Sequence, residues 1–466
     1  MPTFSMISSL ILASLTLIIG CGGSGGSTTG GSTQPPALLI TSHPANTTVN
    51  AGQPATFSVT ASGSGNLSYQ WKKNGQTVLT AASNTYVTPL LRSQDSGTSY
   101  AVVVSDTHGN SATSSPAIVT VSPVVYQGSF VSAGTMLALR TSHTSTVLQN
   151  GKVLIVGGFS GGSTVLASCE IYDPSMGSFS PTGSMSTARY SHTATLLQDG
   201  KVLIVGGAGS SGSLLATAEI YDPLSGSFAT TGSLATGRNA HSATILNDGK
   251  TLIAGGQATG GAVLSSAELY DPALGLFVAR NSVGVSRGFH TGTLLTNGRV
   301  LLAGGKSSGG TPSTSSVIYD HATGLFSPTG SMSTPRAMHG AVPLQDGRVL
   351  VAGGVTTFSG LALTSSSEIY DPNSGAFTPS GGMGSARYAF TLVVLSSGNV
   401  LAAGCEPGGT VADILSPSTG TWTPTGSMSF GRGNHSASVL FSGKVLVTGG
   451  DNGGGSASLA SAEIFQ

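Results

Sequence analysis

Short runs in which apolar and polar residues alternate fill most of the chain after residue 37. In a β-strand successive side chains point to opposite faces, so this alternation predicts strands with one buried face. Examples are ATFSVTA at 55–61, LSYQWKK at 67–73 and SYAVVVSD at 99–106. Turn residues separate the runs, and long stretches of helix-forming residues are missing. The pattern therefore predicts an all-β fold built from many short strands.

Residues 37–122 are predicted to form a first domain, a small β-sandwich. Trp71 lies in one predicted strand, and the segment DSG at 95–97 precedes Tyr100 at the start of a later strand. A buried Trp followed by such a Tyr resembles the immunoglobulin fold with its tyrosine corner. The resemblance implies an N-terminal immunoglobulin-like β-sandwich, and another kind of small β-sandwich stays open as the alternative.

From residue 126 onward the pattern repeats with a period of about 49 residues. An arginine opens each unit, and a histidine follows three residues later in every unit except the sixth, which has Phe390. A double glycine then closes an apolar run in most units. Each unit predicts four strands, with a tight turn such as Asp-Gly between the first two. The arginines are Arg140, Arg189, Arg238, Arg287, Arg336, Arg387 and Arg432.

Seven such units in phase, six of them with a double glycine after the second strand and the sixth with Gly404-Cys405, resemble the kelch repeat. The resemblance implies a seven-bladed kelch-type β-propeller over residues 123–466. The segment 128–136 matches residues 177–185, whereas the last unit stops after its third strand at Gln466. We therefore expect residues 128–136 to supply the fourth strand of blade 7. This would close the ring and remove two free strand edges.

The first 36 residues carry signals of export and anchoring. Residues 7–19 form an uncharged apolar run that is too short to span a bilayer, as in a signal peptide. The run ends in IIGC at 18–21, which resembles the lipobox of bacterial lipoproteins. The resemblance implies a cleaved signal peptide at 1–20 and a lipid on Cys21, followed by a flexible Gly/Ser/Thr linker at 21–36.

This anchor sets the expected location of the protein. We expect a lipoprotein of the bacterial cell envelope, attached to the outer membrane or cell surface, with secretion as the alternative. The formal net charge is +0, with 18 Lys and Arg against 18 Asp and Glu. The sequence therefore offers no basic face for nucleic acid. We expect a monomer that contacts the membrane through its lipid.

Residues that recur in every blade are expected to have a structural role that is common to all blades. An Arg before the first strand is predicted to pair with a Glu on the third strand, and the His to bond a backbone carbonyl. Blade 4 has Val317 at the acidic position and blade 6 has Asp413. One histidine per blade is too dispersed for a metal site, so we expect neither metal nor cofactor.

Positions that differ between blades follow the double glycine and the arginine. The order of the strands places both positions at one end of the propeller channel. Mixed aromatic, amide and charged groups there favour a glycan or a protein loop as ligand. The candidate ligand-binding residues are Phe159, Tyr190, Asn239, Gln257, Phe289, Lys306, Tyr388, Glu406, Asn434 and Asp451.

The favoured function is therefore a binding or adhesion module without a catalytic centre. The alternative is an enzyme similar to galactose oxidase, or another carbohydrate-active enzyme. Galactose oxidase has a propeller of the same general kind, and the resemblance would imply a copper site with a tyrosine cross-linked to a cysteine. Cys169 and Cys405 are the candidates, but the repeat places neither near a Tyr and His pair.

The lipobox generates the first testable expectation. Replacing Cys21 with Ser removes the thiol that would carry the lipid, so the variant should leave the membrane fraction and lose label from a metabolic fatty-acid probe. Fractionation and labelling of both forms check this. A variant that stays membrane-bound, beside an unlabelled wild type, would show that the lipobox interpretation is wrong.

Overall fold

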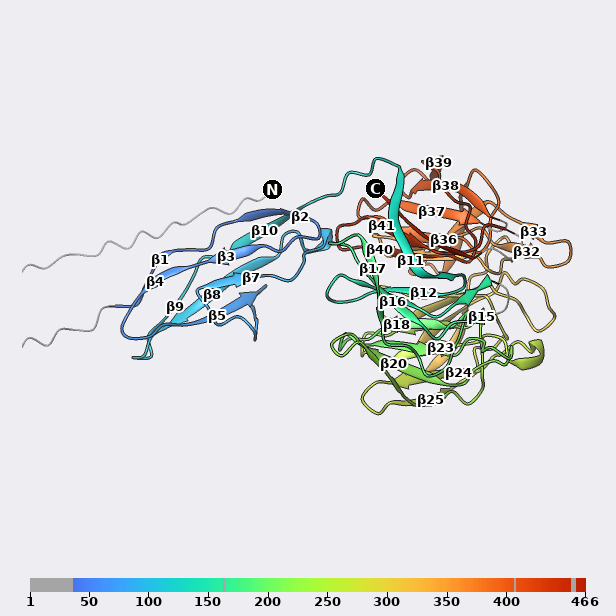
Figure 1. The fold of residues 1–466 in the computed structure, drawn as a ribbon, viewed down its shortest axis with the longest axis horizontal. Coiled ribbons are helices and arrows are strands. Elements are labelled where there is room, and N and C mark those ends of the chain that lie inside the picture. The colour runs from blue at the N-terminus through green and yellow to red at the C-terminus, as the bar shows by residue number, and fades with distance from the viewer. Residues whose placement is uncertain (1–36, 162–163, 406–407, 454–457) are drawn as a thin grey trace, which may run out of the picture.

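The structure is a computed structural model with two domains, a small sandwich and a large ring of sheets (Figure 1). No helix in the described part of the chain is long and apolar enough to cross a membrane. The predicted signal peptide, Cys21 and its linker lie outside the described residues, as does Glu406. The structure describes residues 37–161, 164–405, 408–453 and 458–466.

The first domain is a β-sandwich around Trp71, which is fully buried. Its indole N–H donates to the carbonyl of Ser83 at 2.8 Å, and the ring of Tyr100 stacks on Phe57 with centroids 4.7 Å apart. Strand β2 pairs in parallel with β10, and the other pairings are antiparallel. The strands are β1 (Leu39–Ser42), β2 (Thr47–Asn50), β3 (Thr56–Ser58), β4 (Thr60–Ser62), β5 (Ser68–Lys73), β6 (Gln76–Thr77), β7 (Thr85–Val87), β8 (Ser99–Ser105), β9 (Ser111–Thr113) and β10 (Ala117–Ser122).

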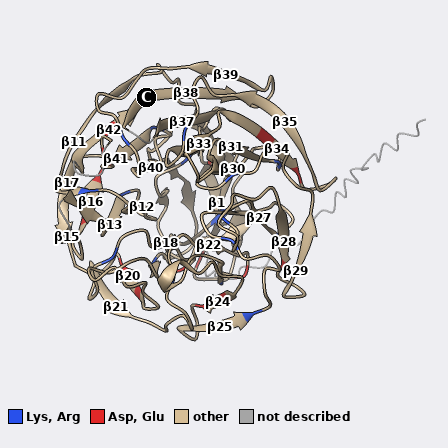
Figure 2. Cartoon of the chain, turned by 90° about the vertical axis from the view of Figure 1, so that its right-hand side faces the viewer, with Lys and Arg blue, Asp and Glu red and all other residues tan. Residues whose placement is uncertain are grey.

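The second domain is a ring of seven four-stranded antiparallel sheets, so the predicted seven-bladed propeller is confirmed (Figure 2). Within each blade we call the strands a to d from the channel outward, and each loop takes the letters of the strands that it joins. Strand b is fully buried in every blade, as its continuous apolar run requires.

The blades follow one another in chain order around the ring. Their strands a to d are β12 (Thr144–Val147), β13 (Val153–Val156), β16 (Cys169–Asp173) and β17 (Ser178–Thr182) in blade 1; β18 (Thr193–Leu196), β19 (Val202–Val205), β20 (Ala218–Asp222) and β21 (Ser227–Thr230) in blade 2; β22 (Ser242–Ile245), β23 (Thr251–Ala254), β24 (Ala267–Asp271) and β25 (Leu276–Arg280) in blade 3; β26 (Thr291–Leu294), β27 (Val300–Ala303), β28 (Ser316–Asp320) and β29 (Leu325–Thr329) in blade 4. They continue as β30 (Gly340–Pro343), β31 (Val349–Ala352), β34 (Ser366–Asp371) and β35 (Ala376–Gly382) in blade 5; β36 (Thr391–Val394), β37 (Val400–Cys405), β38 (Gly409–Ser416) and β39 (Thr421–Pro424) in blade 6; β40 (Ser436–Val439), β41 (Val445–Thr448), β42 (Leu459–Phe465) and β11 (Phe130–Arg140) in blade 7.

Blade 7 joins the two ends of the propeller sequence. Strand β11 pairs antiparallel with β42, with Phe130 opposite Phe465 and Thr135 opposite Ser461. The register shifts twice along this pair, so β11 is bent, and it runs past residue 136 as far as Arg140. The strand is therefore longer than the segment matched in the sequence, because it leads directly into the first d–a loop.

A buried arginine ties together the loops at one end of each blade. Arg140 exposes 0% of its surface, and its Nη2 lies 2.8 Å from Oε1 of Glu170 on strand c. Its Nη1 donates to the carbonyl of Gly157 at 2.7 Å, while Glu170 accepts the N–H of Leu137 at 2.7 Å. One ion pair thus holds the d–a loop against strands b and c, as predicted. The same pair recurs as Arg189–Glu219, Arg238–Glu268, Arg336–Glu368, Arg387–Asp413 and Arg432–Glu463.

The double glycine lets neighbouring blades touch. Gly206 and Gly207 end strand b of blade 2 with φ of 63° and 90°, a region that favours glycine. A Cβ on Gly206 would lie 2.6 Å from the carbonyl oxygen of Arg238 in blade 3. The N–H of Gly207 donates to that same carbonyl at 2.9 Å. The two glycines therefore let the backbones of neighbouring blades approach closely enough to form a hydrogen bond.

Blade 4 lacks this ion pair because Val317 stands where the other blades have a carboxylate. Arg287 is still 1% exposed, and its Nη1 donates to the carbonyls of Gly304 and Ser315 at 3.1 and 3.2 Å. Burial lowers the pKa of Arg287 to about 10, since no carboxylate of the described chain pairs with it. Blade 4 therefore carries a buried charge that only dipoles compensate.

The seam between blades 3 and 4 differs from its neighbours in a second way. At three other seams a threonine at the end of strand d bonds a strand-c tyrosine of the next blade, as Thr182 bonds Tyr221 at 2.8 Å. At this seam the threonine is replaced by Asn281, whose amide donates to the carbonyl of Gly324. The hydroxyl of Tyr319 is left buried without a partner. Blade 4 thus departs from the repeat both at its buried arginine and at its seam with blade 3.

The sandwich is docked on the a–b turns of the propeller, at the end of the ring away from the double glycines (Figure 1). The guanidinium carbon of Arg92 lies 3.9 Å from the ring centroid of Phe441, in the a–b turn of blade 7. In the connection between the domains, the hydroxyl of Tyr126 donates to the carbonyl of Gly443 at 2.7 Å. No pattern in the sequence predicted that the two domains would be in contact.

The ion pairs generate a prediction about stability. Replacing Glu268 with Val in blade 3 copies the arrangement of blade 4 and leaves Arg238 buried without a carboxylate. We expect the free energy of unfolding to fall by about 3–5 kcal/mol, as when one partner of a buried pair is removed. Denaturant unfolding measures this change.

The matched control removes both charges. Arg238→Met combined with Glu268→Val leaves no unpaired charge, so it should cost less than Glu268→Val alone. A single variant within about 1 kcal/mol of wild type would mean that backbone carbonyls alone suffice to hold the arginine.

Candidate functional site

The residue two positions after each arginine has the same unusual backbone conformation. In the described chain these residues have φ between 49° and 56°, a left-handed region that costs a non-glycine residue roughly 1–2 kcal/mol. Their side chains differ from blade to blade and surround the channel at the end where the double glycines lie. They are Ser142, Ser191, Ala240, Phe289, Met338, Ala389 and Asn434.

Backbone hydrogen bonds between blades hold this strained circle in place. The N–H of Ser191 donates to the carbonyl of Ser142 in the preceding blade at 2.9 Å. The N–H of Ser142 donates to the carbonyl of Asn434 at 2.9 Å, across the seam where the ring closes. The same bond runs from Phe289 to Ala240 and from Met338 to Phe289. The circle is therefore a rigid frame whose side chains vary.

The histidine that follows this residue bridges neighbouring blades. Nε2 of His192 lies 3.0 Å from Oγ1 of Thr144 in blade 1, and Nε2 of His143 lies 2.9 Å from Oγ1 of Thr448 in blade 7. The partner of Nε2 is thus a hydroxyl of the adjacent blade and not the predicted backbone carbonyl, because the inner strands pack side by side around the axis. Burial and the nearby Arg140 lower the pKa of His143 to about 3.

The circle of left-handed residues encloses a cavity of about 360 Å³ at the mouth of the channel. This size is within the range of small-molecule sites, about 300–1,000 Å³. Phe289 and Phe390 contribute aromatic rings to its lining, and Asn239 and Asn434 contribute amides. Its described lining residues include no Asp, Glu, Lys or Arg, and the lining histidines are neutral at pH 7. We call this uncharged polar cavity the mouth.

The residues predicted to bind ligand lie in two circles around the mouth. Asn239, Phe289 and Asn434 line the cavity itself. Gln257 and Lys306 do not line it. Each follows a double glycine and forms a β-bridge with a residue of the d–a loop, Gln257 with Asn239 and Lys306 with Gly288. The d–a and b–c loops therefore meet at one end of the ring.

The remaining predicted residues belong to the outer circle. The rings of Phe159 and Tyr190 pack against each other with centroids 5.6 Å apart, so part of each aromatic face is already covered. Tyr388 stands at the position of Tyr190 in blade 6 and is partly buried. Asp451 is 5% exposed and accepts the hydroxyl of Thr141 at 3.1 Å.

Within the described chain, two acceptor oxygens around the mouth have no hydrogen-bond partner. They are Oδ1 of Asn239 and Oδ1 of Asp451, and both atoms are buried. Buried polar atoms in folded proteins are almost always satisfied, so an orphan acceptor indicates either water or a missing donor. Because both atoms are acceptors, the mouth is suited to a ligand rich in hydroxyl or amine donors.

Sequence reasoning missed part of the lining. Ser142, Ser191, Ala240 and Ala389 also face the cavity, together with the histidines. Their fixed place between Arg and His was visible in the repeat. Serine and alanine have no preference for positive φ, however, so nothing in the sequence indicated that this position turns inward.

The comparisons with known proteins agree with this architecture. The sequence profile of the Kelch motif family matches residues 140–186, which is one repeat unit. A curated protein, the decoration protein of Escherichia phage T5, is 38% identical over 95 residues. That match covers 20% of this chain and 57% of the phage protein, so the chain spans little more than half the length of this relative.

Two solved structures share the fold. A fungal alcohol oxidase of the AA5 family, determined in complex with copper, superposes with a TM-score of 0.60 at 18% identity, covering 72% of this chain and 75% of the oxidase. The structure of YjhT superposes with a TM-score of 0.50 at 15% identity, covering 63% of this chain and 99% of YjhT. Together with the sevenfold repeat, these likenesses define the second domain as a kelch-type β-propeller.

The described donor groups of this chain do not fit a copper site. The described residues contain no group of three or more His, Cys, Asp or Glu placed to hold a metal ion. Nε2 of each mouth histidine is already engaged with a hydroxyl. Cys169 and Cys405 are free thiols, and burial raises the pKa of Cys169 to about 11. We derive no copper chemistry from these residues.

The histidine circle generates a prediction about acid stability. The folded-state pKa of His143, His241, His339 and His435 is lowered to about 3, chiefly by burial. The unfolded chain takes up these protons near pH 6.5, so stability is lost as pH falls from about 6.5 toward 3. Each histidine should cost about 2 kcal/mol at pH 5. Thermal melts between pH 8 and pH 5, done at constant ionic strength, check this.

A natural substitution within the chain supplies the control. Blade 6 carries Phe390 at the histidine position, so His339→Phe should be tolerated in blade 5. This variant should take up about one proton fewer on unfolding at pH 5 and show a shallower pH dependence. Melting temperatures that do not change between pH 7.5 and pH 5.5 would contradict the prediction.

Proposed function

We propose that this protein is a binding or adhesion module that captures a glycan at the mouth of its propeller. The single observation that carries the proposal is the mouth itself, an uncharged cavity lined by aromatic rings and by amides, of which Asn239 has an orphan acceptor oxygen. Sugars present apolar ring faces together with hydroxyl donors, which this combination suits. A protein loop is the alternative occupant.

The rigidity of the mouth supports a binding role. Interblade hydrogen bonds fix the backbone on which Asn239, Phe289 and Asn434 stand. A ligand that meets a fixed frame loses less free energy to the ordering of loops on binding. Asn239 lines the cavity, and its buried Oδ1 has no hydrogen-bond partner among the described residues, so a ligand donor is a suitable partner for it.

We further propose that Cys21 carries a lipid that holds the protein at the bacterial cell envelope, on the outer membrane or cell surface, as a monomer. The sandwich would then be an immunoglobulin-like spacer. The parallel pairing of β2 with β10 and the buried Trp71 and Tyr100 support that assignment. Release into the medium is the alternative location.

A carbohydrate-active enzyme is the alternative function. The predicted carboxylate pair of Glu406 and Asp451 has one member outside the described residues, and Asp451 is engaged by Thr141 and Asn434. Both hydrogen bonds go to Oδ2 of Asp451, so this oxygen is already engaged. The binding module therefore has more support from the described side chains.

A glycan array with the purified protein tests the proposal, followed by titration of the best ligand. Phe289→Ala removes an aromatic face from the mouth, and we expect affinity to fall about tenfold, which is about 1.4 kcal/mol. Tyr190→Ala should weaken binding less, because its ring already packs on Phe159. Neither variant should shift the melting temperature much.

Lys201→Gln is the matched control, since Lys201 pairs with Asp222 at 3.7 Å on the opposite end of the propeller. Its affinity should equal that of wild type. An array without hits, beside capture of a defined protein that Phe289→Ala abolishes, would favour the protein ligand. If Lys201→Gln loses binding and Phe289→Ala keeps it, the binding site lies at the a–b turns and not at the mouth.

A further inference from the structure

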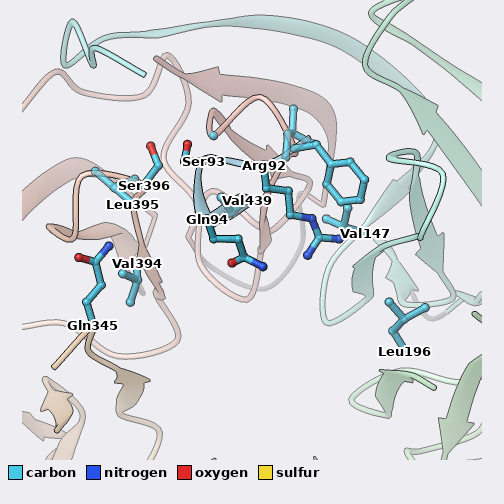
Figure 3. Close-up of a pocket in the computed structure, with 13 residues that line it drawn as sticks. Arg92, Ser93, Gln94, Val147, Leu196, Gln345, Val394, Leu395, Ser396 and Val439 are labelled. Carbon is cyan, nitrogen blue, oxygen red and sulfur yellow. The ribbon is translucent and has the colours of Figure 1, made fainter. Parts of the chain in front are cut away.

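A second cavity lies at the other end of the channel, where the propeller meets the sandwich. Its volume is about 570 Å³, larger than that of the mouth. Figure 3 shows Arg92 and Gln94 of the sandwich pointing into a space that Val147, Leu196 and Val394 of the propeller also face. Binding sites for small molecules often occur at domain interfaces. We call this cavity the interdomain pocket.

The propeller side of the interdomain pocket is aliphatic. Val147, Leu196, Val394 and Val439 are each the last residue of strand a, in blades 1, 2, 6 and 7. All four are partly exposed, whereas farther along the same strands Ser and Thr hydroxyls are common. Covering apolar surface that faces water lowers the free energy by about 25 cal/mol per Å². An apolar chain is therefore the complementary group for this wall.

The sandwich side carries one charge. Among the described residues that line the pocket, Arg92 alone is charged, and its guanidinium carbon lies 3.9 Å from the ring centroid of Phe441. The nearby Asp95 pairs with Lys73 at 3.5 Å instead, and within the described chain no carboxylate pairs with Arg92. Stacking fixes the plane of the guanidinium and leaves its edge free for two parallel hydrogen bonds to a carboxylate.

From this arrangement we infer that the interdomain pocket binds a small amphipathic carboxylate, such as an aliphatic acid of medium chain length. The carboxylate accepts two hydrogen bonds from Arg92, and the chain covers the aliphatic ends of the inner strands. Gln94 and Gln345 offer amide donors beside the carboxylate. The ligand bridges both domains, so it stabilises their docking. This site is independent of the mouth and of any glycan.

Calorimetric titration of the full-length protein with decanoate tests the inference. We expect one saturable site per chain, and no comparable site for decylamine, whose ammonium Arg92 repels. Arg92→Gln should weaken decanoate at least tenfold. Arg280→Gln removes a positive charge from the outer strand of blade 3 and should leave the affinity unchanged.

Arg92→Gln also removes the contact with Phe441, so a second variant is needed from the propeller side. Val394→Asp places a carboxylate on the aliphatic wall and should abolish decanoate binding while glycan binding at the mouth persists. The inference is overturned if wild type does not bind decanoate, if decylamine binds equally well, or if Val394→Asp binds decanoate as wild type does.

Discussion

The buried pairing of a guanidinium with a carboxylate in most blades is the interaction on which the shape of the propeller mouth depends. An arginine with 0–1% exposure cannot be left without partners, because a buried charge is costly unless it is paired and hydrogen-bonded. Its partners come from three different segments, namely the d–a loop, the end of strand b and strand c. The need to satisfy one charge therefore fixes the path of a loop that has little regular structure.

The strained backbone at the mouth follows from this constraint. Once the arginine is held, the next residues must turn toward the axis within a short distance, and they do so through a left-handed residue in each blade. Interblade hydrogen bonds offset the strain, and closure of the ring by β11 and β42 lets them continue across the last seam, where Ser142 donates to the carbonyl of Asn434. Blade 4 shows that the constraint is local, since Arg287 keeps its place on carbonyl dipoles alone between two regular neighbours.

Much of the fold was predictable because its signals are periodic. The spacing of Arg, His and Gly-Gly predicted seven blades and the pairing of Arg140 with Glu170, and both predictions are confirmed. The docking of the sandwich was not predictable, because Arg92 and Phe441 belong to no repeat and are far apart in the sequence. Packing of Tyr190 on Phe159 was missed for a similar reason, since a side-chain contact between two variable loops leaves no pattern.

The two ends of the channel use charge in opposite ways. At the mouth every arginine points inward to its buried carboxylate or carbonyls, so the scaffold takes up the charges and the ligand surface is left neutral. At the a–b turns the charges pair within a blade on the surface, as Lys152 does with Asp173 at 2.9 Å. Arg92 differs from them, because the sandwich brings it to the channel from outside the repeat and it stacks on Phe441. For the ligands proposed above, selectivity at the mouth would come from shape, amides and aromatic faces, and selectivity at the interdomain pocket from the charge of Arg92.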